Sequence, residues 1–449
     1  MTSNIGSLPI GVQPFVHRMT QSRSPNIIRE SRLLRPQSNT YATNSDTCIR
    51  FVMPQQNADF RTSSLRMDVT ITTTGVTTYK RLAQGGMMSG INRIRWFSGT
   101  VEESNEYYNR VQNMIYNSSV DPDVIASIGQ DLLGYGTQTD RNAQGAIAGA
   151  KVTVPVNIGI LSQGVLPFQQ LARGTDFNVE FYLENALWFV ETDGLNPVVS
   201  ITNIQWDYEY VYSTDGSYES AVAAKIASGQ VQFGYPTWAC FQNAIINTVN
   251  DIQIPWRGNA LSLIACIIVD QATIATTTVN DKFTTWIKTM SNGSTVVEYQ
   301  IQLKDGLWLP VEPIRCDGFA ERAFSEYLKS EGMWSNDAIS QWTAPIDVSS
   351  FVQDQFLMVS NLNAIPVEAY AKQYYFNNVS TMKQSQNTVF RLTLSAVPVT
   401  QMVLYSFVCF GTLLGVSPSG GLGCRTLPCL SILSSRSVRI SNLSSVLMT

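Results

Sequence analysis

The chain consists mainly of short runs of β-branched and aromatic residues, each bounded by Gly, Pro, Asn or Asp. Such runs favour strands, because these side chains pack well on a pleated surface and the bounding residues favour turns. One series of runs begins near residue 47 and a second near residue 237. The run SITNIQWDYEYVYS, which ends the first series, alternates in places with a period of two, as a half-buried strand does. We therefore predict an all-β fold with two β-sandwiches in tandem.

Each series is interrupted by one amphipathic segment that predicts a helix. The first segment is residues 100–119. Thr100 at its start and Glu103 three residues later have the spacing of a capping box. The apolar residues of this segment recur at helical spacing, at Tyr107, Tyr108, Val111, Met114 and Ile115. The second segment follows Asp317, a favourable N-cap residue, and stops at Gly332. Its apolar stripe consists of Phe319, Ala323, Phe324, Tyr327 and Leu328.

Changes in composition and in the runs of strand-favouring residues divide the chain into four parts. Residues 1–44 form an irregular arm interrupted by four prolines, and residues 45–212 hold the first series of strands. Residues 213–236 are rich in Gly and other small residues, which is typical of a linker of low order between domains. Residues 237–449 hold the second series of strands.

The N-terminal arm is the one part of the chain with a clear excess of positive charge. Five arginines face Glu30 alone as an opposing charge, and they are Arg18, Arg23, Arg29, Arg32 and Arg35. Two interpretations stay open. The arm contacts something acidic, such as nucleic acid, lipid headgroups or a partner's acidic patch. Alternatively, it lies extended along a neighbouring subunit with the arginines serving as hydrogen-bond donors, which is the interpretation we prefer.

The charged fraction limits what the surface can do. Charged residues make up 14% of the 449 residues, whereas about 25% is usual in soluble domains. Ser, Thr, Asn and Gln must supply the polar surface, which suits a secreted β-protein or a self-assembling shell whose neighbours approach without strong charge repulsion. A net charge of −4 argues against a nucleic-acid-binding protein as a whole.

Cysteines and apolar segments indicate an intracellular, soluble protein. The seven cysteines are odd in number and form no CxxC motif, so we expect buried free thiols rather than a disulfide framework. The first residues lack the apolar core of a signal peptide. The apolar run from Met402 to Val416 is shorter than the roughly 20 residues of a membrane helix, and we predict a buried pair of strands there.

The residues that catalysis needs are scarce. The only histidine is His17, in the arm, so no Ser–His–Asp, Cys–His or histidine-based metal site can form in the body of the fold. We predict no enzyme activity, no metal and no cofactor. The aromatic residues Trp206, Tyr208 and Tyr210 leave three alternatives open: a sugar-binding platform, part of a sandwich core, or part of a subunit contact.

The order of these segments resembles that of the double jelly-roll major capsid proteins of DNA viruses, the lineage of adenovirus hexon, tailless phages and virophages. The resemblance rests on FRTSSLRMDVTITTTG, INRIRWFSGTVEESNEYYNRVQNMI and KVTVPVNIGILSQGVLPFQQLARGTDFNVEFYLENA in the first half. In the second half it rests on LKDGLWLPVEPIRCDGFAERAFSEYLKSEGMW and on QNTVFRLTLSAV followed by QMVLYSFVCFG. It covers roughly residues 45–449 and concerns the order of the predicted strands and helices and their residue composition.

The resemblance implies two tandem eight-stranded jelly rolls, each with a flanking helix. It also implies a homotrimer that forms a pseudo-hexagonal capsomer in an icosahedral shell around the genome. The arm would face the virion interior and contact minor capsid or penton proteins, an inner membrane or the genome. The expected location is the virion, assembled inside the host cell without a signal peptide. The outward loops would be residues 117–149 and those after Gly332. Alternatives are a carbohydrate-binding adhesin or spike and a minor capsid protein at the vertex.

Overall fold

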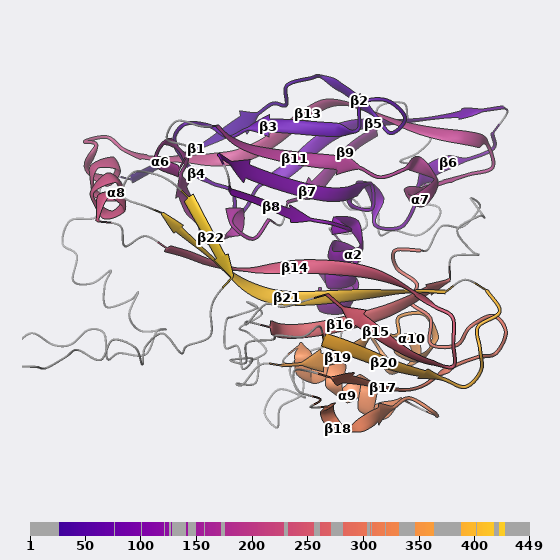
Figure 1. Ribbon diagram of the computed structural model, residues 1–449. Helices are drawn as coiled ribbons and strands as arrows, with labels where there is room; N and C mark the ends of the chain where they lie inside the picture. Colours follow the sequence, from indigo (N-terminus) through magenta and orange to yellow (C-terminus); the bar gives the residue numbers. More distant parts are fainter. Residues whose placement is uncertain are drawn as a thin grey trace, which may run out of the picture.

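Figure 1 shows the computed structural model of the chain. The described residues are 27–75, 77–99, 101–120, 122–124, 127, 141, 150–156, 158–171, 176–228, 232–255, 261–270, 282–302, 306, 308–318, 320–331, 346–362, 388–400, 402–416 and 422–426. Predictions for His17, Arg18, Arg23, Gly332 and most of the two long loops lie outside these residues. No helix within the described residues is long and apolar enough to cross a membrane.

The N-terminal half of the chain forms a sandwich of antiparallel sheets, which we call the first sandwich. Its strands are β1 (Ile27–Leu34), β2 (Thr40–Ala42), β3 (Cys48–Val52), β4 (Asn57–Asp59), β5 (Ser64–Thr74), β6 (Lys80–Leu82), β7 (Ile91–Ser98), β8 (Val101–Asn105), β9 (Ala150–Pro155), β10 (Val165–Pro167), β11 (Phe177–Leu183), β12 (Val190–Thr192) and β13 (Leu195–Ser213). One sheet has the order β10-β4-β13-β5-β9, with β1 and β2 both paired to β13. The facing sheet has the order β3-β11-β7-β8, and β6 pairs with β12 separately.

The C-terminal half forms the second sandwich. Its strands are β14 (Gln232–Ile245), β15 (Val249–Ile254), β16 (Leu261–Asp270), β17 (Val296–Gln302), β18 (Trp308–Arg315), β19 (Met358–Asn361), β20 (Thr388–Leu394), β21 (Met402–Val416) and β22 (Leu422–Thr426). The two sheets have the orders β14-β21-β16-β19, with β22 on β21, and β15-β20-β17-β18. In both sandwiches the first strand lies beside the last long strand, so the topology is repeated although the sequences differ.

Short helices lie around the sheets. They are α2 (Tyr108–Ser119), α3 (Pro122–Val124), α6 (Phe168–Leu171), α7 (Ala186–Phe189), α8 (Ser217–Ala227), α9 (Glu321–Ser330) and α10 (Val348–Gln353), with 3-10 turns η2 (Gly86–Met88) and η4 (Leu161–Gln163). The two predicted amphipathic helices are present as α2 and α9, each following the edge strand of a four-stranded sheet.

The predicted start of the first helix was wrong. Glu103 lies in β8, which pairs with β7, and α2 begins only at Tyr108 after Tyr107 in the left-handed region with φ 53°. The capping-box prediction failed because the Glu103 side chain has other partners, the hydroxyls of Tyr235 and Thr237. Sequence spacing alone could not reveal these distant partners.

The predicted start of the second helix was wrong in the same sense. Asp317 lies before a turn, and α9 starts at Glu321 after Ala320, which is again left-handed with φ 53°. At neither helix does the side chain of the N-cap residue accept a hydrogen bond from a backbone N–H of the first turn. Both helices are therefore entered by the same backbone turn, and packing rather than side-chain capping determines where they begin.

Two stretches predicted to be irregular contain regular structure. Residues 27–34 of the arm form β1, an edge strand flanked in the sequence by Pro25 and Pro36, and residues 40–42 form β2. Within residues 213–236, α8 begins after a turn in which the Ser217 amide donates to Asp215, and β14 starts at Gln232. The division of the chain at this stretch stays a prediction.

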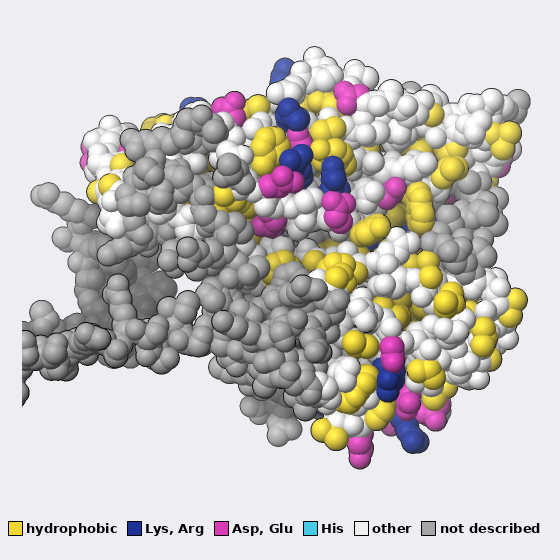
Figure 2. Space-filling model, in the orientation of Figure 1, with side chains coloured by type: hydrophobic (Ala, Val, Ile, Leu, Met, Phe, Trp, Pro, Cys, Tyr) yellow, Lys and Arg dark blue, Asp and Glu magenta, His cyan; other side chains and the backbone are white. Residues whose placement is uncertain are grey.

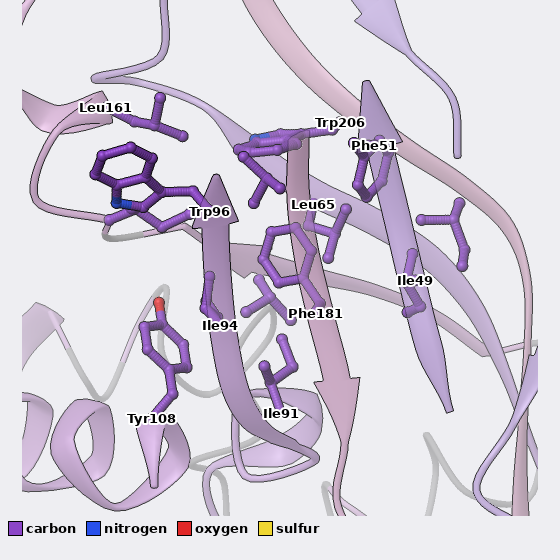
Figure 3. Packing of buried hydrophobic residues seen from close by; sticks show 14 of the residues in the cluster. Ile49, Phe51, Leu65, Ile91, Ile94, Trp96, Tyr108, Leu161, Phe181 and Trp206 are labelled. Carbon is purple, nitrogen blue, oxygen red and sulfur yellow. The ribbon is translucent and has the colours of Figure 1, made fainter. Parts of the chain in front are cut away.

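Aromatic residues join the two sheets of the first sandwich. Trp206 of β13 contacts Phe51 of β3 and Phe181 of β11 edge-on, with ring centroids 5.2 and 5.4 Å apart (Figure 3). All three side chains are fully buried. Trp206 and Tyr208 thus belong to the sandwich core, which is one of the alternatives that the sequence left open for them.

The second core is built on strands that are apolar along their whole length. The run from Met402 to Val416 forms one long strand, β21, rather than the predicted pair. It pairs with β14 on one side and β16 on the other. The core cluster around it also includes Val111 and Met114 of α2, which belongs by sequence to the first sandwich. Cys240, Cys266, Cys316 and Cys409 are buried free thiols, as predicted, and Cys48 is half-buried.

Replacing Val111 with aspartate tests this helix position. Val111 is 3% exposed, and an unpaired carboxylate there should lower the free energy of unfolding by roughly 3 kcal/mol or more. Urea denaturation followed by tryptophan fluorescence measures the change. Ala224→Asp on the exposed side of α8 is the control. Equal losses in the two variants would contradict the packing of α2 against the second sandwich.

Candidate functional site: the N-terminal strand and the seam between the sandwiches

The arm enters the fold through β1. This strand pairs antiparallel with the C-terminal half of β13, from Ile27 opposite Ser213 to Leu34 opposite Trp206. Among the described strands β13 is its only partner, so no described strand covers the other edge of β1. Ile27, Ile28 and Leu33 are exposed by 43%, 37% and 51%. An open edge with apolar side chains is a typical place for contact with another chain.

Arg29 anchors β1 to a buried carboxylate. Its guanidinium lies 3.1 Å from Asp59, which is 3% exposed, and it also pairs with Glu209. Arg61 contacts the same Asp59 carboxylate at 2.6 Å. Burial alone would raise the pKa of Asp59, but the hydrogen bonds from Arg61 and Arg29 outweigh it and hold the pKa below its ordinary value.

The other candidate arginines of the arm have different surroundings. Arg32 donates to Glu30 at 2.8 Å and to Gln56 at 3.2 Å, and its guanidinium lies 4.3 Å from the centre of the Tyr210 ring. Arg35 is exposed. Arg29 and Arg32 therefore contribute to the fold of this chain. The proposed contacts of all five arginines, Arg29 and Arg32 included, with another molecule stay a prediction.

The seam between the sandwiches contains a carboxylate that the sequence placed in a helix cap. Glu103 of β8 accepts hydrogen bonds from the Tyr235 hydroxyl at 2.7 Å and the Thr237 hydroxyl at 2.9 Å, both on β14. Burial raises the pKa of Glu103 above its ordinary value, although the two hydroxyls partly oppose the shift. Close packing continues beside it, because a Cβ on Gly159 would lie 2.5 Å from the Tyr235 ring.

The α2 helix is the larger part of the seam. The Tyr107 hydroxyl at its start donates to Gln242 of β14 at 3.0 Å. Arg110 is 3% exposed, donates to the Lys282 carbonyl, and lies over the rings of Phe283 and Tyr405 at 4.2 and 4.6 Å. Aromatic rings and a backbone carbonyl thus accommodate a cation removed from water.

The C-terminal end of α2 reaches the second helix. The Tyr327 hydroxyl of α9 donates to the Ser118 carbonyl at 2.6 Å, and Tyr327 is fully buried. This bond satisfies one of the carbonyls that a helix end leaves without a partner. The two helices predicted from separate amphipathic patterns are therefore in direct contact, which neither pattern indicated.

The outer face of the sheet β3-β11-β7-β8 concentrates charge in a chain that has little of it. Figure 2 shows basic and acidic side chains gathered over these strands. Glu180 is fully buried and lies 2.7 Å from the Arg50 Nε, and its other oxygen lies 3.5 Å from Arg95. Arg95 also pairs with Glu102 at 2.7 Å. The charges are matched within the sheet, so this face has no obvious excess to attract a charged partner.

Glu103→Gln tests the half-buried carboxylate of the seam. The folded pKa of Glu103 is raised, so its contribution to stability is fully present below the unfolded pKa of about 4.3 and is lost as pH rises through the folded value. The glutamine variant lacks this titration. We expect wild type to lose stability relative to the variant as pH rises above about 4.3. Urea denaturation of both proteins across pH measures the difference in stability, and a difference independent of pH would contradict a raised pKa of Glu103.

Comparison with known proteins shows which fold this arrangement belongs to. No family model matches the sequence, and no curated protein matches it. Solved structures do match. VP54 of PBCV-1 gives a TM-score of 0.58 at 12% identity, covering 90% of this chain and 98% of that one. The Faustovirus major capsid protein gives 0.56 at 10% identity, covering 88% and 91%.

The mavirus major capsid protein has a similar likeness, with a TM-score of 0.50 at 12% identity, covering 90% of this chain and 92% of that one. The matches extend across both sandwiches, since each covers most of the chain. Identities of this size establish the fold alone. Together with the repeated strand order, they show that the chain has the double jelly-roll fold.

Proposed function

We propose that this chain is the subunit of a viral capsid, forming pseudo-hexagonal trimeric capsomers that build an icosahedral shell around a genome. The observation that carries the proposal is the tandem fold, which matches the VP54 structure over 90% of this chain. Two sandwiches of the same topology in one subunit give a trimer six similar blocks, which suits a six-sided capsomer. The protein would then be located in the virion, after assembly inside the host cell.

The seam supports this proposal because a shell subunit must keep its two blocks in a fixed relation. The α2 helix contributes Val111 and Met114 to the core of the second sandwich, and Glu103 and Tyr327 add hydrogen bonds across the boundary. An interface with shared core residues cannot open without exposing apolar surface. The subunit would thus enter the lattice as one rigid block.

The arm of the proposed subunit begins before β1. Arg29 and Arg32 contact the first sandwich from β1, so we expect partner contacts mainly from the segment before Ile27 and from the exposed Arg35 that follows β1. Arg18 and Arg23 belong to that segment. We propose that it contacts a neighbouring subunit, a minor capsid or penton protein, an inner membrane or the genome.

The carbohydrate-binding alternative has less support from the structure. Trp206 and Tyr208 are 0% and 7% exposed, so they cannot offer their rings to a sugar. Tyr210 is half-buried beneath the Arg32 guanidinium. We propose no catalytic role for any residue of this chain.

Electron microscopy of the purified chain tests the capsomer directly. Class averages should show particles with threefold symmetry and a hexagonal outline, because three subunits supply six sandwiches. Analytical ultracentrifugation at several protein concentrations gives the mass independently. Monomers with two lobes at every concentration would contradict the proposal.

Two truncations separate the arm from the strand that anchors it. Deleting residues 1–26 leaves β1 and the Arg29–Asp59 contact intact, so the protein should fold and form capsomers but assemble shells poorly. Deleting residues 1–35 removes β1, exposes the edge of β13 and takes one guanidinium from Asp59, so soluble yield and melting temperature should fall. Light scattering of shell assembly and thermal melting measure the two effects. Identical behaviour of the two truncations would show that β1 does not anchor the arm.

A further inference from the structure

One end of the second sandwich carries a cluster of exposed apolar side chains. Two turns meet there, residues 246–248 between β14 and β15 and residues 395–400 after β20 (Figure 1). Because β14 pairs with β21 and β15 with β20, the two turns run side by side. Four of the twelve large apolar residues that are exposed in the described part of the chain lie here: Ile246, Val249, Val397 and Val399, exposed by 66%, 51%, 54% and 81%.

A third turn, residues 289–295, is hydrogen-bonded to residues 395–400, and we call these two turns and residues 246–250 together the apolar tip. No residue of the tip is charged, although 14% of the chain is. The nearest charges along β15 and β20 are Asp251 and Arg391, which pair with each other at 2.6 Å. This ion pair lies two residues from the start of β15, or about 7 Å along the strand. The tip is therefore a neutral, apolar surface above a neutralised pair of charges.

Backbone polar groups in the first turn of the tip are paired within the protein. The Asn250 side-chain oxygen accepts hydrogen bonds from the amides of Ile246 and Asn247, at 3.2 and 3.1 Å. Its side-chain nitrogen donates to the Asn247 carbonyl at 2.5 Å. The Leu394 amide donates to the Thr248 carbonyl at 2.7 Å. One asparagine and the neighbouring strand thus satisfy groups that an exposed turn can leave to water.

The carbonyls of the second turn are paired in the same way. The Asn292 side-chain nitrogen donates to the Val397 carbonyl at 3.1 Å, and the Ser294 hydroxyl donates to the Ala396 carbonyl at 2.7 Å. A backbone group without a partner is costly in lipid, because no water is there to replace the missing bond. Internal pairing of the turns therefore suits a surface that leaves water for lipid.

We infer that the apolar tip inserts into the interface of an uncharged, zwitterionic lipid bilayer. Aliphatic side chains that protrude from turns fit fluid acyl chains, whereas a folded protein partner would need a hollow that matches them. Interfacial insertion reaches about 5–10 Å, which brings the Asp251–Arg391 pair to the level of the lipid headgroups. The contact depends on burying apolar surface and not on attraction between charges.

The apolar tip lies at the other end of the subunit from the arm. The first residue of β1 pairs with the last residue of β13, and α8 follows β13 directly. From there the 14 residues of β14 extend roughly 45 Å to the tip. A bilayer at the tip is therefore on the opposite side of the subunit from any membrane that the arm contacts. The inference goes beyond the proposed capsid role and does not depend on the trimer.

Flotation with vesicles of pure phosphatidylcholine tests the inference on the full chain. We expect the chain to float with the vesicles at low and at high salt, because an apolar contact is not screened. The double variant Ile246→Asp with Val399→Asp should float roughly tenfold less, since a carboxylate is costly in the bilayer. Val311→Asp is the matched control, because Val311 on β18 is also 81% exposed, and it should float like wild type. Circular dichroism confirms that the variants fold.

An environment-sensitive dye shows which end of the chain enters the lipid. Chains with Val399→Cys or Val311→Cys are labelled, and labelled wild type gives the background from the native cysteines. Vesicles should shift the emission to the blue for the first variant only. A chain without residues 1–26 should float like the full chain.

Several results would overturn the inference. They are a wild-type chain that does not float at any lipid concentration, an equal loss in the double variant and in Val311→Asp, and flotation abolished by high salt or by removing residues 1–26. A chain that floats as expected but forms no trimer would contradict the proposed capsomer and leave the lipid contact standing.

Discussion

The structure depends on one short helix that packs against both sandwiches. The α2 helix follows the last strand of a sheet in the first sandwich, yet its Val111 and Met114 complete the core of the second. Because packing in a protein interior is dense, neither core is complete without the other half of the chain. The polar contacts along the same boundary, from Glu103 to Tyr327, are placed by this packing and give it a single register.

Much of the fold could be predicted from local pattern. Strands bounded by turn residues, two amphipathic helices and buried thiols all follow from periodicity and composition, and each depends on residues close together in the sequence. The two helix starts could not be predicted. At Glu103 a capping pattern competed with strand pairing, and the hydroxyls of Tyr235 and Thr237, more than a hundred residues away, determined the outcome.

The candidate site was predictable only in part, for a related reason. An excess of arginine marked the arm, but charge alone does not tell whether a guanidinium pairs within the chain or with another molecule. The Asp59 carboxylate pairs with Arg61, two residues later, and with Arg29, 30 residues earlier. Only the neighbouring Arg61 could be expected from the sequence, because nothing in the pattern links Arg29 to Asp59. The β1 strand was missed because its side chains are exposed on both faces, so it lacks the alternation that identifies most strands.

The pairing of β1 with β13 has a mechanical consequence. Whatever the residues before Ile27 attach to, any tension on them reaches the body of the protein through eight paired positions along β13. A pull along the strand loads these positions together, in shear, whereas a pull across it would separate them one at a time, starting at Ile27. The ion pairs of Arg29 with Asp59 and Glu209 lie near that first position and oppose its opening. The direction in which the residues before Ile27 leave the folded body would therefore decide how much force the pairing of β1 with β13 can withstand.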